Sequence, residues 1–330
     1  MFSPATFIPQ SIERTDFSVL VLRYDKAGDL LVSTPFLRSL REHFPQARID
    51  VLCGKHNRQL AANLSEWNIG NVVYDKSLRS VVSLFRSRGH YTVVVDMMDN
   101  PSRTSALLLR LLSPMVSIGF DHAHPPGSPH AVSHPVPLPD RRSVHIIDCM
   151  KQLLQPFGID PKAESSLPFV PGYSLTHPPK SGEILLHISA GKEQLWWGEQ
   201  RYRALCENIL RRHPGTELSI GCAPLDTARA LRIADGLPVH ILPPVASFTD
   251  YCAYIEKAKL LVTPDTSVVH VASAVGTPTV AMYAKPHSDR MPWYPYGVAY
   301  RAVTSTLNEG VDDITIEAMT EAVSSLWSSL

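Results

Sequence analysis

The sequence predicts an α/β protein made of two doubly wound domains, each built on a parallel sheet. Short β-branched strands alternate with helical patterns in both halves of the 330-residue chain, and this alternation is typical of parallel sheets with helical crossovers. The length is comfortable for two hydrophobic cores. A proline-rich segment, 168–183, separates the halves. We therefore expect an N-terminal Rossmann-like domain over residues 1–172 and a C-terminal one over residues 173–330.

In the first half, strands and helices are expected to alternate up to a proline- and histidine-rich loop. The strands are predicted at 17–24, 47–53, 71–76, 91–97 and 115–120. The helices are predicted at 36–44, 57–64, 78–87, 102–112 and 143–157. The loop covers residues 121–142, and Pro35 is expected to restart or kink a helix in its first turns.

The same alternation restarts after the linker. Strands are predicted at 183–189, 216–222, 238–243, 259–265 and 277–284. Helices are predicted at 199–212, 226–235, 249–257, 267–275 and 315–330, the last of which could pack back on the first domain. Two such halves joined by a hinge predict a central cleft, and this class of fold binds ligands at the carboxyl ends of its strands.

Composition and motifs exclude several classes of protein. The formal net charge is zero, so no global field favours nucleic acid. Neither half has G-x-G-x-x-G after its first strand, which argues against a dinucleotide-dependent oxidoreductase, and no P-loop motif is present. The five cysteines form no C-x-x-C pair and are expected to be reduced packing residues. No signal peptide or apolar stretch of about 20 residues occurs, so a cytoplasmic location is expected.

The turn after the first strand carries the first candidate site. Gly28 permits a tight turn and the close approach of a ligand. Asp29 follows at a helix start, where two interpretations compete. It could cap the free N–H groups of the helix, or it could be a general base directed into the cleft.

The second candidate site lies where a strand ends and a helix begins, at Thr263–His270. A helix start with Thr266 and Ser267 offers backbone N–H groups to an anion. His270, one turn further, could face a bound phosphate or be a satisfied core histidine. Gly276 is expected to end this helix.

Taken together, these segments resemble glycosyltransferase family 9, the ADP-heptose:lipopolysaccharide heptosyltransferases. The pattern R-x-D-x-x-G-D-L-L-x-S-T-P spans Arg23–Pro35, and D-T-x-x-x-H-x-A-x-A-x-G-T-P-T-V spans Asp265–Val280. The stretches 91–121, 185–191 and 285–297 are similar to further family segments in the same order. The resemblance covers most of the chain and implies a GT-B type of fold.

The resemblance also implies a reaction. Asp29 would deprotonate the acceptor hydroxyl, and the sugar would be transferred with inversion from a nucleotide diphosphate donor, ADP-heptose, to a lipid-linked saccharide of the lipopolysaccharide core. The donor-binding residues implied are Ser189, Lys192, Asp265, Thr266, Ser267 and His270. No cofactor and no metal are implied, and contact with the inner membrane would be peripheral. The first domain would bind the acceptor and the second the donor.

Three departures from the family pattern leave alternatives open. Ser267 replaces a glycine, the family lysine falls on Leu195 with Lys192 as a substitute nearby, and the glutamate expected near Ala223 is missing. The chain could therefore use another donor, such as a UDP- or GDP-sugar, or be a non-catalytic nucleotide or glycan binder.

A cluster of histidines in the first domain's loop raises the question of a metal site. These are His122, His124, His130 and His134. They are expected to be solvated loop residues or acceptor contacts rather than metal ligands, because no helix or strand frames them.

Overall fold

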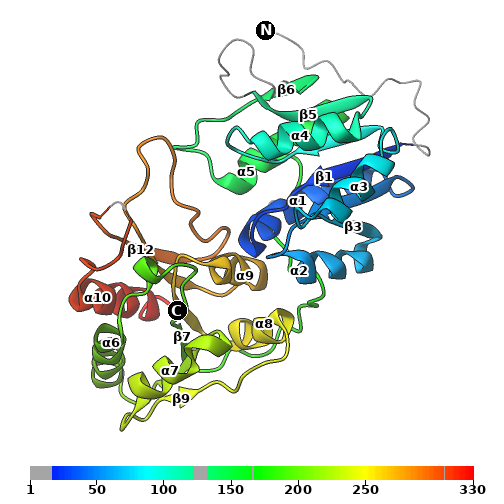
Figure 1. Cartoon of the computed structure of the whole chain (residues 1–330). Helices are drawn as coiled ribbons and strands as arrows, with labels where there is room; N and C mark the ends of the chain where they lie inside the picture. Colours follow the sequence, from blue (N-terminus) through cyan, green and yellow to red (C-terminus); the bar gives the residue numbers. More distant parts are fainter. Residues whose placement is uncertain (1–16, 122–131, 166, 308) are drawn as a thin grey trace. The chain divides into compact units, whose positions relative to one another are not determined.

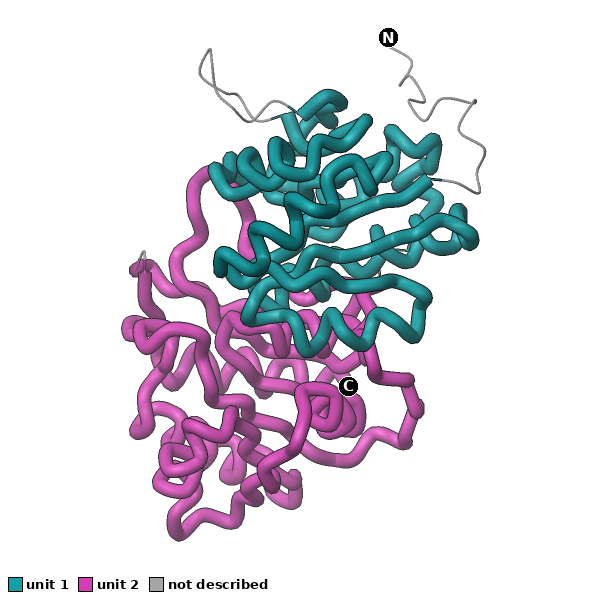
Figure 2. Tube along the Cα trace, turned by 45° about the vertical axis from the view of Figure 1, so that its right-hand side comes forward, with its two compact units in different colours: residues 1–166 teal, residues 167–330 magenta. Residues whose placement is uncertain are grey.

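The computed structural model describes residues 17–121, 132–165, 167–307 and 309–330. It divides into two compact units, Met1–Ser166 and Leu167–Leu330 (Figure 2). The division falls six residues before the boundary at residue 172 that the sequence suggests. Each unit holds one six-stranded sheet in which every paired strand is parallel. The predicted α/β class with two doubly wound sheets is confirmed.

The first unit has the strand order β3-β2-β1-β4-β5-β6 (Figure 1). Its strands are β1 (Ser18–Leu22), β2 (Arg48–Cys53), β3 (Ile69–Val73), β4 (Val93–Asp96), β5 (Val116–Asp121) and β6 (His134–Pro137). Its helices are α1 (Ala27–His43), α2 (Arg58–Ala62), η1 (Asn63–Trp67), α3 (Leu78–Arg86), α4 (Arg103–Leu112), α5 (Ile146–Lys151) and η2 (Gln152–Phe157). Since helices cover both faces, the central strands are almost entirely buried and apolar.

The second unit has the strand order β12-β11-β10-β7-β8-β9. Its strands are β7 (Glu183–His187), β8 (Glu217–Gly221), β9 (His240–Ile241), β10 (Leu260–Pro264), β11 (Thr279–Tyr283) and β12 (Tyr300–Thr304). Its helices are η3 (Glu193–Leu195), α6 (Glu199–Arg212), η4 (Pro224–Asp226), α7 (Thr227–Ala234), α8 (Phe248–Lys257), α9 (Ser267–Val275) and α10 (Ile316–Trp327). In the described parts of the chain, no helix is long and apolar enough to cross a bilayer.

The first helix starts in the predicted turn just before Asp29 and continues through Pro35 as one element, without a restart at residue 36. Helix α1 starts at Ala27 and includes Pro35 in its interior. A proline there cannot donate to the carbonyl four residues earlier, which belongs to Leu31. The Thr34 hydroxyl donates to that carbonyl at 2.7 Å instead. The local side chain thus satisfies the acceptor that the proline leaves without its usual donor.

Two edge strands were not predicted. β6 occupies part of the segment expected to be a loop, and β12 follows the loop 285–297. β6 contains two prolines, which are tolerated on an edge strand because one side of it needs no ladder partner. β12 is largely exposed, so it lacks the apolar run by which the central strands were recognised. His134 begins β6, whereas His122, His124 and His130 lie outside the described residues.

Candidate active site

In each unit the strand order reverses at one pair of neighbouring strands. That pair is β1 and β4 in the first unit, and β7 and β10 in the second. Loops that follow two such strands leave toward opposite faces of the sheet, and open α/β sheets bind ligands beside these loops. The four loops after β1, β4, β7 and β10 are therefore where functional side chains are expected.

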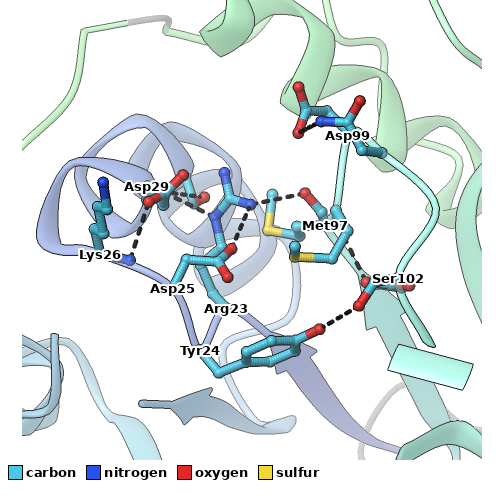
Figure 3. A network of polar contacts seen from close by, with 12 residues as sticks. Arg23, Tyr24, Asp25, Lys26, Asp29, Met97, Asp99 and Ser102 are labelled. Atoms are coloured by element: carbon cyan, nitrogen blue, oxygen red, sulfur yellow. Dashed lines mark hydrogen bonds and ion pairs between the residues drawn. The ribbon is translucent and has the colours of Figure 1, made fainter. Parts of the chain in front are cut away.

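Arg23 is the first residue after β1, and its guanidinium connects two of these loops (Figure 3). The residue is 2% exposed. Its Nε donates to the Asp29 carbonyl at 2.9 Å, and Nη1 donates to the Met97 carbonyl at 2.8 Å. The Asp25 carboxylate lies 3.8 Å from Nη1. A buried guanidinium is tolerated only when its donors are bonded, so Arg23 fixes the start of α1 against the loop after β4.

Asp29 is the third residue of α1 and takes part in capping the helix. Its Oδ2 accepts the backbone N–H of Lys26, the N-cap residue, at 3.0 Å (Figure 3). The residue is partly exposed, and an ionised carboxylate has acceptor capacity beyond one bond. Capping and proton transfer are thus compatible for this side chain, and the general-base role stays a prediction. Gly28 precedes it within the first turn of α1.

Carboxylates gather around the same turn. Burial raises the pKa of Asp25, and the nearby charges of Asp29 and Asp99 act in the same direction. Burial raises the pKa of Asp96, the last residue of β4, to about 6. Asp96 accepts from the Ser105 hydroxyl at 2.9 Å. Burial foremost, and neighbouring negative charge second, thus increases the affinity of Asp25 and Asp96 for protons.

The backbone of the β1–α1 turn is held tightly by the loop after β2. A Cβ atom on Gly54 would lie 2.0 Å from the Tyr24 carbonyl oxygen, so only glycine fits there. The buried Asn57 donates to the Arg23 carbonyl at 2.7 Å and accepts from the Gly54 N–H at 2.8 Å. The turn that carries Asp29 is therefore constrained from two sides.

In the second unit, the turn after β10 leads directly into α9. The Asp265 N–H donates to the Met282 carbonyl at 2.9 Å, and the Thr266 hydroxyl caps the helix by accepting from the Val268 N–H at 3.3 Å. Ser267 is the first residue of α9. Gly276 ends the helix with a φ of 72°, as predicted. The N-terminus of α9 carries the positive end of the helix dipole and can hold an anion.

Ser189 lies in the loop after β7 and is bonded to an acid that sequence reasoning missed. The Ser189 hydroxyl donates to Asp226 Oδ2 at 2.6 Å and accepts from the Ala223 N–H at 2.8 Å. The chain thus carries an acid, Asp226, three positions after Ala223, where the family pattern predicts a glutamate. Attention to any acid within a few residues of the end of β8 would have found it.

The loop after β7 is also held by a cation. Arg229 pairs with Asp226 at 3.1 Å and with Glu193 at 2.7 Å, and its guanidinium lies 4.0 Å from the ring centre of Trp196. Lys192, next to Glu193, is exposed. Leu195, where the family lysine was expected, instead packs against the hydrophobic core.

His270 is 3% exposed, one turn into α9. Its ring centre lies 6.0 Å from that of Trp293, which belongs to the loop 285–297. Burial agrees with the core interpretation of this histidine, and its role toward a donor stays a prediction. Among the described residues, no group of three or more His, Cys, Asp or Glu side chains is arranged to hold a metal ion.

The comparisons with known proteins agree on one family. The model of glycosyltransferase family 9 (heptosyltransferase) matches residues 81–318, well over half of the chain. The chain is 24% identical to lipopolysaccharide heptosyltransferase 3 of Escherichia coli over 298 residues, 82% of this chain and 83% of that protein.

Solved structures share the fold. The family 9 glycosyl transferase from Veillonella parvula DSM 2008 superposes with a TM-score of 0.72 at 17% identity, covering 96% of this chain and 99% of that one. The E. coli heptosyltransferase WaaC, solved with ADP-2-deoxy-2-fluoro heptose, gives 0.70 at 18% identity, with 94% and 99% covered. The two doubly wound units thus follow the GT-B type expected from the sequence. The chain therefore belongs to glycosyltransferase family 9, the heptosyltransferase family, and is a glycosyltransferase.

Proposed function

We propose that this protein transfers a heptose-type sugar from ADP-heptose to a saccharide acceptor of the lipopolysaccharide core. The observation that carries the proposal is the position of the predicted residues in the two sheets. The predicted base and the predicted donor residues lie in the loops that follow the strands where the strand order reverses. Arg23 and Asp29 follow β1, and Arg23 also bonds to the loop after β4. Ser189 follows β7, and Asp265 and Thr266 follow β10. The relatives named lipopolysaccharide heptosyltransferase support the sugar and the acceptor.

In the proposed reaction, the Asp29 carboxylate removes the proton of an acceptor hydroxyl. The resulting nucleophilic oxygen forms a bond to the anomeric carbon while the bond from that carbon to the donor phosphate oxygen breaks. A single displacement of this kind inverts the anomeric configuration. The products are the extended saccharide and a nucleoside diphosphate, with the proton on Asp29 passing to solvent.

The second unit would bind the donor and stabilise its leaving group. The N-terminus of α9, with Thr266 and Ser267, faces the developing charge on the diphosphate, and Lys192 adds a cation from the loop after β7. Asp265 and His270 are the remaining residues of the proposed donor site. Asp226, already bonded to Ser189, would accept from hydroxyls of the donor ribose, because a carboxylate is an acceptor with spare lone pairs.

Binding and turnover test the proposal separately. Thermal-shift and calorimetric titrations with ADP, UDP, GDP, CDP and NAD should show selective stabilisation by ADP. ADP release should then depend on ADP-heptose and a heptose-acceptor saccharide together. Preference for UDP or GDP would replace the donor, binding without turnover would favour a non-catalytic binder, and stabilisation by NAD alone would refute the proposal.

A further inference from the structure

Helices α3 and α4 together cover one face of the first unit's sheet. They contact each other, and the Gly89 N–H, just after α3, donates to the carbonyl of Leu112 in α4 at 2.9 Å (Figure 1). Their inner sides bury Leu84, Leu108 and Leu112 against the sheet. Their outer sides carry several large exposed side chains, and these residues carry the inference.

The outer side of α3 is unusually apolar. Leu78 is 80% exposed, Val82 40% and Phe85 55%, and their spacing of four and three residues places them on one stripe of the helix. Leu107, 49% exposed, adds to them from the outer side of α4. An amphipathic surface helix ordinarily directs polar side chains outward. A group of large apolar side chains on two packed helices is instead typical of an interaction surface.

The charged residues within α3 and α4 all have one sign. Exposed arginines stand beside the apolar stripe on both helices: Arg79, Arg86, Arg103 and Arg110. The chain contains no acidic residue between Asp75 and Asp96, nor from residue 100 to residue 120. This is a local feature, since the whole chain has a formal net charge of zero. We call these four arginines, with Leu78, Val82, Phe85 and Leu107, the α3–α4 face.

We propose that the α3–α4 face docks onto the surface of a bilayer that contains anionic phospholipid. Helices that lie in a membrane interface combine leucine and phenylalanine on one side with arginine or lysine around them. Arginine guanidinium groups pair with lipid phosphates, and the apolar side chains between them enter the boundary of the acyl chains. A lipid surface satisfies both features, whereas a uniformly polar polyanion would leave Leu78 and Phe85 without a partner.

Docking of this kind deepens the proposed function without depending on it. An enzyme whose acceptor is lipid-anchored gains from a surface that keeps it near the bilayer. Vesicle binding itself requires neither donor nor acceptor, so it can succeed even if the proposed donor is wrong. Nucleotide titrations on the same preparations keep the two questions apart.

The test is flotation of the full chain with vesicles of phosphatidylcholine alone or mixed with phosphatidylglycerol. We expect binding to the anionic vesicles only, weakened by high salt because exposed charges are screened. The variant Arg79→Glu/Arg86→Glu reverses the charge at two positions and should weaken partitioning of the protein onto anionic vesicles by at least about tenfold. Leu78→Ser/Phe85→Ser should also weaken it, since less apolar area is buried. The conservative variant Arg79→Lys/Arg86→Lys should retain binding.

A matched control changes the same charges elsewhere. Arg211 and Arg212 are exposed on α6 of the second unit, and Arg211→Glu/Arg212→Glu should bind vesicles as the unmodified chain does. Equal loss in both double variants would show a general charge effect and overturn the proposal. So would equal binding to neutral vesicles, or no binding to either. If Leu78→Ser/Phe85→Ser turned a dimer into a monomer and left vesicle binding intact, the face would be a self-interface instead.

Discussion

Replacing Asp29 separates chemistry from helix capping, because the side chain does both in the proposed mechanism. A general base typically contributes about 10²–10⁴ in rate, so both Asp29→Asn and Asp29→Ala should lower kcat by that much. The two variants differ in stability. Asparagine keeps an oxygen that can accept the Lys26 N–H now bonded at 3.0 Å, whereas alanine loses the bond. A cap element of this kind contributes about 0.3–1.5 kcal/mol, so only Asp29→Ala should melt a few degrees lower.

Helix α8 offers a matched control for this experiment. Asp250 is its third residue, and its Oδ2 accepts the Ser247 N–H at 3.1 Å in the same capping arrangement. Asp250→Ala should lower the melting temperature like Asp29→Ala and leave kcat unchanged. The assay is coupled ADP release at saturating donor and acceptor, with melting followed by circular dichroism. Wild-type turnover in Asp29→Asn would refute the base assignment, and an equal loss of turnover in Asp250→Ala would show that capping explains the effect.

Three further predictions follow from the contacts in the two units. Arg23→Met should lower kcat while leaving the affinity for ADP unchanged, because Arg23 holds the backbone carbonyl of Asp29 in place and contacts none of the predicted donor residues. Asp226→Asn should reduce the preference for ADP over 2′-deoxy-ADP in calorimetric titrations, because its neutral amide is a weaker acceptor for a ribose hydroxyl. Asp96→Asn should stabilise the protein against urea at pH 7 and do so less at pH 5. The raised pKa of Asp96 means that the folded state binds its proton more tightly than the unfolded one, so stability is lost as pH rises through about 6, by up to about 3 kcal/mol.

Each of these predictions has a contrary outcome. If Arg23→Met also bound ADP more weakly, the substitution would have disturbed the whole fold and not only the β1–α1 turn. If Asp226→Asn kept the unmodified protein's ratio of affinities for ADP and 2′-deoxy-ADP, the proposed ribose contact would be refuted. A stability difference for Asp96→Asn that does not change between pH 5 and pH 7 would show that Asp96 does not titrate in this range.

The central strands were predictable because burial on both faces makes them continuous apolar runs, as in β1 and β10. The edge strands β6 and β12 lack that signal, since one of their sides needs neither apolar residues nor a hydrogen-bonding partner. A kink or restart was predicted at Pro35 because proline lacks a backbone N–H. The helix continues there because the Thr34 hydroxyl bonds to the carbonyl that would otherwise lack a donor. The sequence thus predicts best where one physical cause dominates a whole segment.

Side-chain pairs distant along the chain were beyond sequence reasoning. Asp29 was recognised because it sits in a local motif. The role of Arg23 was missed because its partners Met97 and Met150 lie 74 and 127 positions away. Asp226 was missed for a similar reason, since its bond to Ser189 spans 37 positions and no local pattern marks it as the acid of that loop.

The contacts around the β1–α1 turn explain most of the motif by which the family was recognised. Arg23 donates to the carbonyls of Asp29 and Met97. The Thr34 hydroxyl donates to the Leu31 carbonyl, which Pro35 leaves without a backbone donor. These residues set the path of the backbone, and Gly54 and Asn57 hold that path from the next loop. Asp29 differs, because one cap bond uses only part of its acceptor capacity and the residue is partly exposed. A general base must be a proton acceptor whose position is set by the fold before the substrate hydroxyl arrives. The constrained β1–α1 turn and the remaining hydrogen-bonding capacity of the Asp29 carboxylate meet these two requirements.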